Sequence, residues 1–513
     1  MGAAKKSYLI FLERRIYMKN KKRILSLLLG VIMLLAVLLN TVGCAAEEEE
    51  ETGEYSREIS TADDGLRYDE NGYLMDDIPE DLNYDGKEVN ILTCREMSYT
   101  VCPEEIQNVV LYDTVYNRNL IIQDRLGVKL NWVLVEGVAS TMDTFIQATA
   151  NAGDGDYDLI CAYSLTPTAL AMNGYLENLN NVEHLAFDKP WWSTSVLENR
   201  FHDTIFFSAT TSSTPVLRQM FVTYYNRQML AENKVEDPEQ LVIDGGWTID
   251  VMKKYSKNFY QDIDGNQKKS LLDIYGTVVM GKVTSDSFFY GCGFNVVSIN
   301  QNTGMPEFCA AGDDYMPMAY FVSDMVSWLC QTNDAYCPST SEGCAEFLTE
   351  NRTAFYVSQL TEVDKMPDVK NWGVLPMPKL DTEQEDYVTA PGNAFDVWCI
   401  RKGARDLAMS GAVLECYASE SYRYSAPLYY EESLSPRYSN DMNGIKIFEL
   451  IRSNLEFDFG RLSNKQLGNF DEFMRNSYMS GNNQLIQEWA TNGKSMQRKL
   501  TSLLDAYKEA GAQ

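Results

Sequence analysis

Histidine is nearly absent from this sequence, with only His184 and His202 in 513 residues. So few imidazole groups leave little material for Ser–His or Cys–His schemes, in which a histidine base activates the nucleophile. The sequence also lacks the G-x-S-x-G, H-E-x-x-H and P-loop patterns. These absences argue against the enzyme classes that those patterns mark. Carboxylates are plentiful, so a glycoside hydrolase that works with two of them stays open as an alternative.

Basic residues are also scarce: 44 Lys and Arg stand against 73 Asp and Glu, a formal net charge of −29. Nucleic-acid binding depends largely on Lys and Arg that neutralise phosphates, so this balance argues against a nucleic-acid partner. It argues equally against docking on an anionic membrane face. We interpret the charge as a well-solvated outer surface.

No pair of cysteines has the C-x-x-C spacing of a zinc or redox site, although the chain has eleven cysteines. Ten remain when Cys44, discussed next, is set aside, and an even number in an exported chain permits disulfides. Several lie in apolar stretches such as Leu159-Ile160-Cys161, where a buried free thiol is the default. We therefore predict no specific bridge.

One apolar run interrupts an otherwise mixed sequence, from residue 24 to 39, after the basic patch at 19–23. Small residues follow, and Thr41-Val42-Gly43-Cys44 resembles the lipobox of bacterial lipoproteins, with Thr41 where Leu is usual. A charged segment, an apolar segment and a small-residue cleavage point make a secretory signal. Translation from Met18 would give it a conventional start. We expect cleavage before Cys44, lipidation of that cysteine, and a location on the extracellular face of the cytoplasmic membrane.

The alternative is a transmembrane anchor that stays uncut. At sixteen residues the run is shorter than the roughly 20 needed to span a bilayer. Residues 45–84 are acidic and poor in apolar side chains, which predicts a flexible linker. The sequence thus predicts a signal peptide over 1–44, a tether over 45–84, and ordered structure from about residue 85.

Strands alternate with helices in the first part of the ordered region. A helix that closes at Gly127 separates the first two expected strands, and another helix precedes the third. Such alternation predicts βαβ units and a largely parallel sheet. Ligands of open α/β sheets bind beyond the carboxyl ends of the strands, here the loops at 94–96 and 163–166. The predicted strands are 88–93, 128–135 and 156–162, and the helices 114–126 and 142–150.

The later part of the chain continues the mixed α/β pattern. Thr248 is expected as the N-cap of a helix, because a threonine hydroxyl accepts the free N–H groups of the first turn. Further strands are predicted at 221–225, 354–357 and 373–376, and further helices at 227–232, 316–329, 406–419, 445–455, 485–489 and 500–507.

Short motifs along the exported chain resemble those of extracellular solute-binding proteins that deliver cargo to ABC importers, in the branch of maltose- and oligosaccharide-binding proteins. The resemblance implies an α/β, two-lobed periplasmic-binding-protein-like fold of type II, in which each lobe is a mostly parallel sheet flanked by helices. Hinge strands would join the lobes, with lobe 1 at 85–216 and 352–401 and lobe 2 at 217–351 and 402–513. The motifs are YDGKEVNIL at 84–92, RLGVK at 125–129, DYDLI at 156–160, YYNR at 224–227, GWTID at 246–250, GVLPMPK at 373–379, SGAVLE at 410–415 and APLYYE at 426–431.

The resemblance further implies a function: capture of a carbohydrate, in particular an oligosaccharide, in the interlobe cleft and delivery to ABC permease subunits. We expect no catalysis, no required cofactor, a monomer, and contact with the membrane through the lipid anchor alone. Two alternatives stay open. The same fold could bind a peptide or other non-sugar solute, or the chain could be a surface glycoside hydrolase.

Eight residues are candidates for ligand binding, because sugar sites combine aromatic faces with fixed hydrogen-bonding groups. Some follow predicted strands, some lie near a lobe crossing, and others lie in loops. For each, packing between elements or a surface ion pair is the alternative. The candidates are Arg95, Glu96, Tyr163, Ser164, Trp191, Tyr290, Asn393 and Tyr424.

A possible structural calcium loop begins at Asp262. Oxygen-bearing side chains occupy positions 1, 3, 5, 9 and 12 of a twelve-residue segment, which is the EF-hand spacing. Gln267 departs from it at position 6, where glycine is expected, and Asp273 is shorter than the usual glutamate. A plain Asp-Gly turn is the alternative. The expected metal ligands of this loop are Asp262, Asp264, Asn266 and Asp273.

Overall fold

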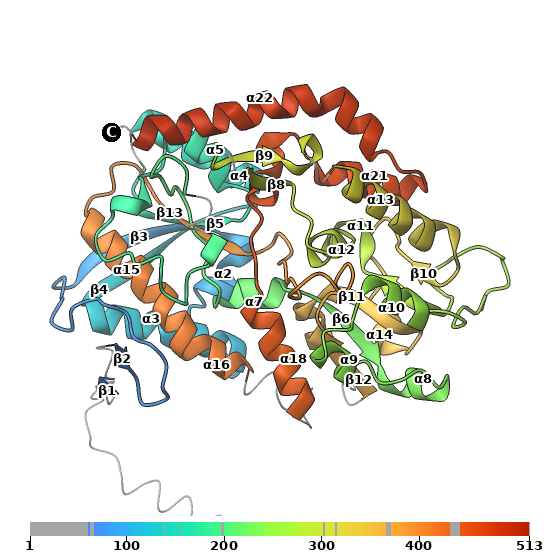
Figure 1. Ribbon diagram of the computed structural model, residues 1–513. Helices are drawn as coiled ribbons and strands as arrows, with labels where there is room; N and C mark the ends of the chain where they lie inside the picture. The colour runs from blue at the N-terminus through green and yellow to red at the C-terminus, as the bar shows by residue number, and fades with distance from the viewer. Residues whose placement is uncertain are drawn as a thin grey trace, which may run out of the picture. The chain divides into compact units, whose positions relative to one another are not determined.

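The computed structural model describes residues 60–61, 66–137, 139–153, 155–195, 200–300, 303–312, 315–365, 371–430 and 442–511 (Figure 1). The predicted signal segment and Cys44 lie outside these residues, so their prediction stays a prediction. Among the described residues, no helix combines the length and the apolar character that a membrane crossing requires.

The first sheet has four strands in the order β13-β5-β3-β4. β3 (Lys87–Cys94) pairs in parallel with β4 (Val128–Val135) and with β5 (Leu159–Tyr163), whereas β13 (Asp396–Ile400) is antiparallel to β5. Neighbouring side chains of a strand point to opposite faces. Accordingly Ile91 belongs to the core shared with α3 (Val110–Leu126) and Leu92 to the core on the other face, with α4 (Ala139–Ala152). The predicted βαβ pattern is confirmed here.

The second sheet has five strands in the order β10-β7-β11-β6-β12. Its central strands are almost wholly buried, as expected for a sheet covered on both faces. β11 pairs in parallel with β7 and antiparallel with β6, and β12 is antiparallel to β6. The bounds are β6 Phe221–Asn226, β7 Tyr275–Val279, β10 Ala335–Tyr336, β11 Thr353–Gln359 and β12 Trp372–Leu375.

The chain first passes from the first sheet to the second through α7 (Thr214–Gln219), which leads into β6. The predicted return to lobe 1 at residue 352 is wrong, because β11 and β12 hydrogen-bond within the second sheet. The return comes after β12 and before β13. Strands buried on both faces look alike in either sheet, and only their pairing assigns them.

The assignment of everything after residue 401 to lobe 2 is also wrong. Buried residues of α15 (Leu407–Glu420) share a core with α3 and the first sheet, including Ile122 and Trp398. By contrast, α18 (Met442–Ser453) lies against β12 and α9 (Glu239–Ile243) of the second half. The last helix, α22 (Leu485–Gly511), contacts α5 (Pro167–Met172) as well as α21 (Asp471–Ser480). It merges two helices that the sequence pattern predicted separately.

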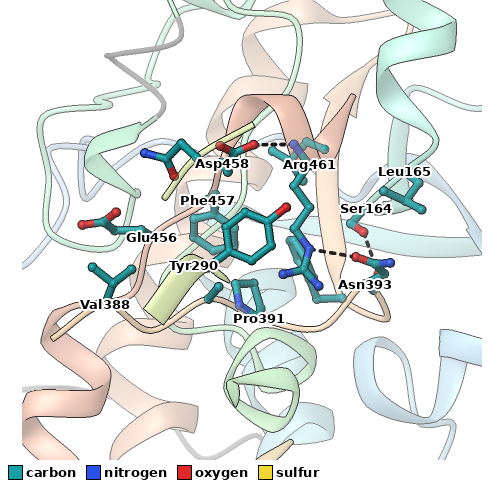
Figure 2. Close-up of a pocket in the computed structure, with 14 residues that line it drawn as sticks. Ser164, Leu165, Tyr290, Val388, Pro391, Asn393, Glu456, Phe457, Asp458 and Arg461 are labelled. Atoms are coloured by element: carbon teal, nitrogen blue, oxygen red, sulfur yellow. Dashed lines mark hydrogen bonds between the residues drawn. The ribbon is translucent and has the colours of Figure 1, made fainter. Parts of the chain in front are cut away.

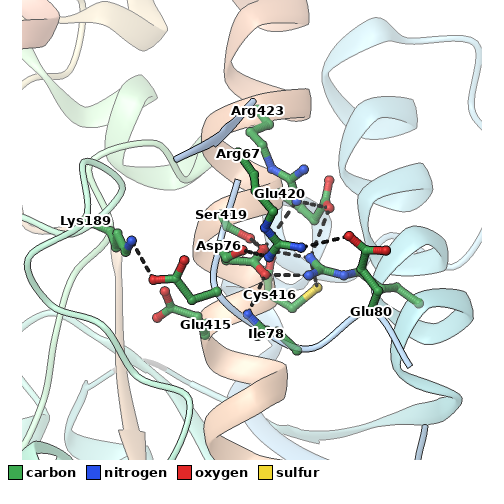
Figure 3. A network of polar contacts seen from close by, with 12 residues as sticks. Arg67, Asp76, Ile78, Glu80, Lys189, Glu415, Cys416, Ser419, Glu420 and Arg423 are labelled. Atoms are coloured by element: carbon green, nitrogen blue, oxygen red, sulfur yellow. Dashed lines mark hydrogen bonds and ion pairs between the residues drawn. The ribbon is translucent and has the colours of Figure 1, made fainter. Parts of the chain in front are cut away.

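The predicted flexible linker is wrong for its last part. From Leu66 to Tyr84 the chain packs on the first half, with Met75 and Ile78 buried. Asp76 is buried and accepts hydrogen bonds from Arg125, Ser419 and Arg423 (Figure 3). Acidic residues suggested a solvated tether, but this carboxylate finds guanidinium partners from distant helices. The segment over 45–59 lies outside the described residues.

The local signals at helix ends are confirmed. Gly127 follows α3 with a φ of 59°, the left-handed conformation that glycine adopts readily, and the hydroxyl of Thr248 accepts from Val251 at the start of α10 (Ile249–Tyr255).

The ten cysteines in the described residues are all free thiols. The remaining elements include β1 Ser60–Thr61, β2 Arg67–Tyr68, β8 Val297–Asn300, β9 Met305–Phe308, α2 Arg95–Val101, α8 Arg227–Glu232, α11 Gly281–Thr284, α12 Asp286–Gly291, α13 Tyr315–Val326, α14 Glu346–Thr349, α16 Ala426–Leu428, α19 Phe459–Leu462 and α20 Asn464–Leu467.

Candidate functional site

A small cavity lies where the two halves meet two linking segments (Figure 2). Ser164 and Leu165 reach it directly after β5, and Tyr290 comes from α12 of the second half. The base of the cavity consists of residues 388–395, which lead into β13, and residues 456–462. These two segments run parallel and are joined by backbone hydrogen bonds between Thr389 and residues 454 and 456. Such a location lets both halves contribute to one site.

A much larger cavity adjoins the first and shares four lining residues with it. Its volume is about 550 Å³, which suits a sugar-sized ligand. Thr194 and Ser195 line it from one side, and β8 with Val297 and Ser298 from the other. The shared residues are Asn295, Glu456, Phe457 and Asp458.

The side chain of Arg461 is the most prominent charged group in the small cavity. It is 4% exposed, and its guanidinium lies 4.7 Å from the ring centroid of Tyr290 and 5.2 Å from that of Phe221. Its Nε donates to Oδ1 of Asn393 at 3.1 Å, whereas Nη1 and Nη2 have no hydrogen-bond partner in the described structure. The arrangement presents a fixed cationic group whose two amino groups are free to bind acceptors.

Asp458 caps the short helix α19 that carries Arg461. Its Oδ1 accepts the backbone N–H of Arg461, and its Oδ2 accepts that of Val296 at 3.0 Å. Burial raises the pKa of the Asp458 carboxyl to about 7, and the charge of Asp471 adds to the rise, although the two backbone N–H groups and Arg461 oppose it. At neutral pH this carboxyl is therefore divided between its charged and uncharged forms.

Three predicted binding residues line the small cavity: Ser164, Tyr290 and Asn393. The hydroxyl of Ser164 donates to the carbonyl of Asn393 at 2.6 Å, and the hydroxyl of Tyr290 donates to Asp471 at 3.0 Å. Burial raises the pKa of Tyr290 well above its ordinary value, so it stays a neutral donor. Whether these groups bind ligand stays a prediction.

Trp191 lies elsewhere, and its assignment to the cleft is wrong. Its side chain is fully buried, and its Nε1 donates to Oε1 of Glu415 at 3.0 Å, while Trp192 donates to Oε2 at 2.9 Å. Burial raises the pKa of Glu415 to about 8, although its three N–H donors pull in the opposite direction. The tryptophan pair belongs to the packing between residues 186–192 and α15.

The remaining candidates do not line either cavity. Arg95 begins α2 on the surface and pairs with Glu136, and Glu96 beside it is exposed. Tyr163 is half-buried at the end of β5, and Tyr424 is half-buried in the π-helical segment Ser421–Ser425 that continues α15. Ser164, which follows β5, and Asn393, which precedes β13, thus lie together at the small cavity. Arg95 and Glu96, which follow β3, lie outside it.

Sequence reasoning missed Arg461, Asp458, Asn295 and Phe457. The one local signal was an aspartate three residues before the arginine, a helix-cap spacing that carries no information about ligands. Asp458 and Arg461 become candidates for the site because Tyr290 and Asn393, which are far from them in the sequence, lie beside them in the structure.

The predicted calcium loop brings three carboxylates together. Oxygen atoms of Asp262, Asp264 and Asp273 lie within 4.8 Å of one another. Oδ1 of Asp262 is buried without a hydrogen-bond partner, while Oδ2 accepts the N–H of Gln267 at 2.8 Å. Gln267, at the position where the EF-hand has glycine, adopts a left-handed φ of 59°. Asp273, however, already accepts hydrogen bonds from Ile263, Ser270 and Tyr275, so its oxygens would be shared with a metal.

Comparison with solved structures reveals the fold. The galacto-N-biose/lacto-N-biose I-binding protein of an ABC transporter from Bifidobacterium longum, in complex with lacto-N-biose, matches with a TM-score of 0.53 and 9% identity, over 83% of this chain and 98% of that one. This is the fold of ABC-transporter sugar-binding proteins. A cyclo/maltodextrin-binding protein complexed with maltotetraose matches with a TM-score of 0.50 and 12% identity, over 83% and 98% of the two chains. A sugar transporter protein of Rhizobium etli, in an open conformation, matches with 0.50 and 10%, over 82% and 99%.

No protein-family model matches the sequence, and comparison with curated proteins finds no match. The solved structures nevertheless confirm, at the level of the fold, the resemblance drawn from short motifs. The confirmed features include two α/β halves and several chain crossings. The resemblance extends over nearly the whole length of the solved structures, although identity is low.

Proposed function

We propose that this protein captures a carbohydrate, in particular an oligosaccharide, in the cavities between its two sheets. The observation that carries the proposal is the small cavity, to which both halves and both linking segments contribute polar groups: Ser164, Tyr290, Asn393 and Arg461. An aromatic ring beside fixed hydrogen-bond donors suits a sugar, which has apolar ring faces and polar edges. Solved proteins of this fold bind lacto-N-biose and maltotetraose, which supports the same ligand class here.

We further propose that lipid attachment at Cys44 holds the protein on the outer face of the membrane, where it passes its solute to ABC permease subunits. The support is the lipobox-like Thr41-Val42-Gly43-Cys44 and a fold shared with ABC-transporter binding proteins. Separation of the lobes would admit ligand, and bound ligand would stabilise the closed form. No catalytic step belongs to this proposal.

A thermal melt of the full chain in mild detergent tests the ligand class. Mono- and oligosaccharides are compared with di- to pentapeptides at millimolar concentration. Ligand at 100 times its dissociation constant adds about 2.7 kcal/mol to stability, a shift that a melt resolves. A shift with one sugar class supports the proposal, whereas a shift with peptides alone contradicts it. Release of smaller sugars from a bound oligosaccharide would instead indicate a glycoside hydrolase.

We also propose a structural calcium ion in the loop from Asp262 to Asp273. The proposal is supported by the three converging carboxylates, and by the buried Oδ1 of Asp262, which lacks a partner. A cation would supply that partner and offset the repulsion between the carboxylates. The ion would have a structural role and would not take part in binding the sugar.

A further inference from the structure

Arg461 carries an unusual pair of buried groups. Among the guanidinium groups in the described part of the chain, it is the one whose Nη1 and Nη2 are both buried and without a hydrogen-bond partner. A buried polar group without a partner loses its hydration and gains nothing in return, and the loss is larger for a charged group. These two atoms therefore favour a ligand that brings acceptors into the small cavity.

The guanidinium is also held in position. The rings of Tyr290 and Phe221 lie 4.7 and 5.2 Å from it, and Nε is occupied by Asn393 at 3.1 Å. Cation–π contacts of this kind fix the plane of the group. With Nε engaged, the two Nη atoms form the free edge of the group. A group fixed in this way loses little conformational entropy when it binds.

We propose that the small cavity binds a carboxylate of an acidic sugar, so that the preferred ligand contains a uronic acid residue. This inference rests on the proposed carbohydrate function and makes its ligand class narrower. A carboxylate offers two coplanar oxygens to the two Nη atoms and neutralises the charge in a single contact. A hydroxyl or ring oxygen offers one acceptor and no charge, so it would pair less completely with the two Nη atoms.

The sizes of the two cavities agree with this division of roles. The small cavity has a free volume of about 20 Å³, which excludes a sugar ring and leaves room only for a small group, whereas the adjoining cavity has about 550 Å³. A pyranose ring fits the larger space, and a carboxylate projecting from it would reach the smaller one past Asn295 and Phe457, which line both.

Asp458, an acidic residue beside Arg461, leaves the free edge of the guanidinium available. Asp458 lines both cavities, but its two oxygens accept the backbone N–H groups of Arg461 and Val296. The structure gives no hydrogen bond from the guanidinium of Arg461 to this carboxylate, so the two Nη atoms stay free for a ligand.

A comparison on the unaltered protein tests the inference without a mutation. Binding of tri-galacturonate, of its methyl ester and of a neutral galactose trisaccharide is measured by calorimetry on the full chain in detergent. The ester removes the charge of the acid and adds one methyl group to each carboxyl, while the neutral trisaccharide lacks the carboxyl group altogether. We expect the free acid to bind about ten to a hundred times more tightly than the ester, the difference that charge-assisted hydrogen bonds produce.

Two variants then connect the preference to the residue. Arg461→Gln should abolish the preference for the acid, and Arg461→Lys should keep part of it, because lysine retains the charge and loses the planar edge. Arg200→Gln, which removes an exposed guanidinium paired with Asp203, serves as the control and should change nothing. Melting curves without ligand check that each variant is folded.

The outcomes separate the inference from the function beneath it. Tight binding of the acid that is lost in Arg461→Gln supports both. Equal binding of acid, ester and neutral sugar overturns the uronate inference and leaves the carbohydrate function intact. Binding of peptides and of no sugar overturns both.

Discussion

The indole Nε1 of Trp191 donates to Oε1 of Glu415 across 3.0 Å in the fully buried core. Trp192 donates to the other oxygen of the same carboxyl group at 2.9 Å. One carboxyl group thus joins two adjacent tryptophans to α15, and the pair belongs to the core of the first half. Several predictions about stability and ligand binding depend on which buried groups serve packing and which serve the site.

Trp191→Phe should reduce the free energy of unfolding by about 1–3 kcal/mol, because Oε1 of Glu415 would lose its donor in a dry environment. Sugar binding should not change. Chemical denaturation measures the change in stability, and calorimetry measures sugar binding. Trp192→Phe, which removes the donor to the other oxygen of the same carboxyl group, is the matched variant for comparison. Lost sugar binding with unchanged stability would contradict this assignment and return Trp191 to the cleft.

Stability should fall as the pH rises from about 5 to about 8, in part through Glu415. Burial raises its pKa from the ordinary 4.5 to about 8. The folded protein therefore keeps a proton that the unfolded chain releases, so the stability from this group is full below pH 4.5 and is lost as the pH approaches 8. Denaturation of wild type and Glu415→Gln at several pH values should give a flatter profile for the variant. Parallel profiles would refute the role of Glu415.

For Asp76 we expect the opposite pH dependence of folding stability, in the acidic range. Burial alone would raise its pKa, but hydrogen bonds and charge from Arg125, with help from Arg423 and Ser419, outweigh burial and lower the pKa from 3.8 to about 2. The stability from this carboxylate is present above pH 3.8 and is lost as the pH falls to about 2, with a size of about 2 kcal/mol. Denaturation between pH 5 and pH 2 measures it.

Two substitutions compare the buried Asp76 with its exposed neighbour Asp77. Asp76→Asn should cost about 3–5 kcal/mol at neutral pH, because it leaves the buried Arg423 without its full complement of charge. Asp77→Asn removes the same charge one residue away, where the carboxylate is 67% exposed and pairs with Lys189, and should cost less than about 1 kcal/mol. Equal effects of the two changes would show that residues 66–84 do not pack as described.

Asn393→Ala should lower affinity for a bound sugar by about tenfold, because Arg461 would lose the acceptor for its Nε and with it its fixed orientation. Asn173→Ala removes an exposed amide that bonds to the carbonyl of Ala169 at the end of α5, and is the control. Calorimetric titration with the best sugar of the thermal panel gives the comparison. Unchanged affinity in Asn393→Ala would exclude the small cavity from the site.

Calcium should raise the melting temperature of wild type, and a chelator should lower it, if the loop at Asp262 holds an ion. Asp262→Asn should remove this response, since the mutated group supplies the buried unpaired oxygen. Glu342→Gln removes an exposed carboxylate outside the loop and should keep the response. A chelator without effect on wild type would refute the calcium proposal.

Local signals carried much of the fold. Apolar patterning predicted β3, β4, β5 and β6 and most of the longer helices, because such patterns depend only on how the residues of one element are buried. Helix ends followed from single residues, as at Gly127 and Thr248. The order of these elements, with the short motifs, was enough to indicate the two-lobed fold that the solved structures share.

Tertiary structure decided what depends on pairing between distant segments. A buried strand reads the same in either sheet, so only hydrogen bonds to β6 and β7 assigned β11 to the second one. The acidic segment before residue 85 was predicted to be solvated, but in the structure Asp76 is buried and paired with Arg125 and Arg423. Tryptophans suited to a sugar proved to be core, while Arg461 became a binding candidate through the approach of Tyr290 and Asn393. Composition and periodicity report how each residue meets water, whereas a site is defined by which residues meet each other.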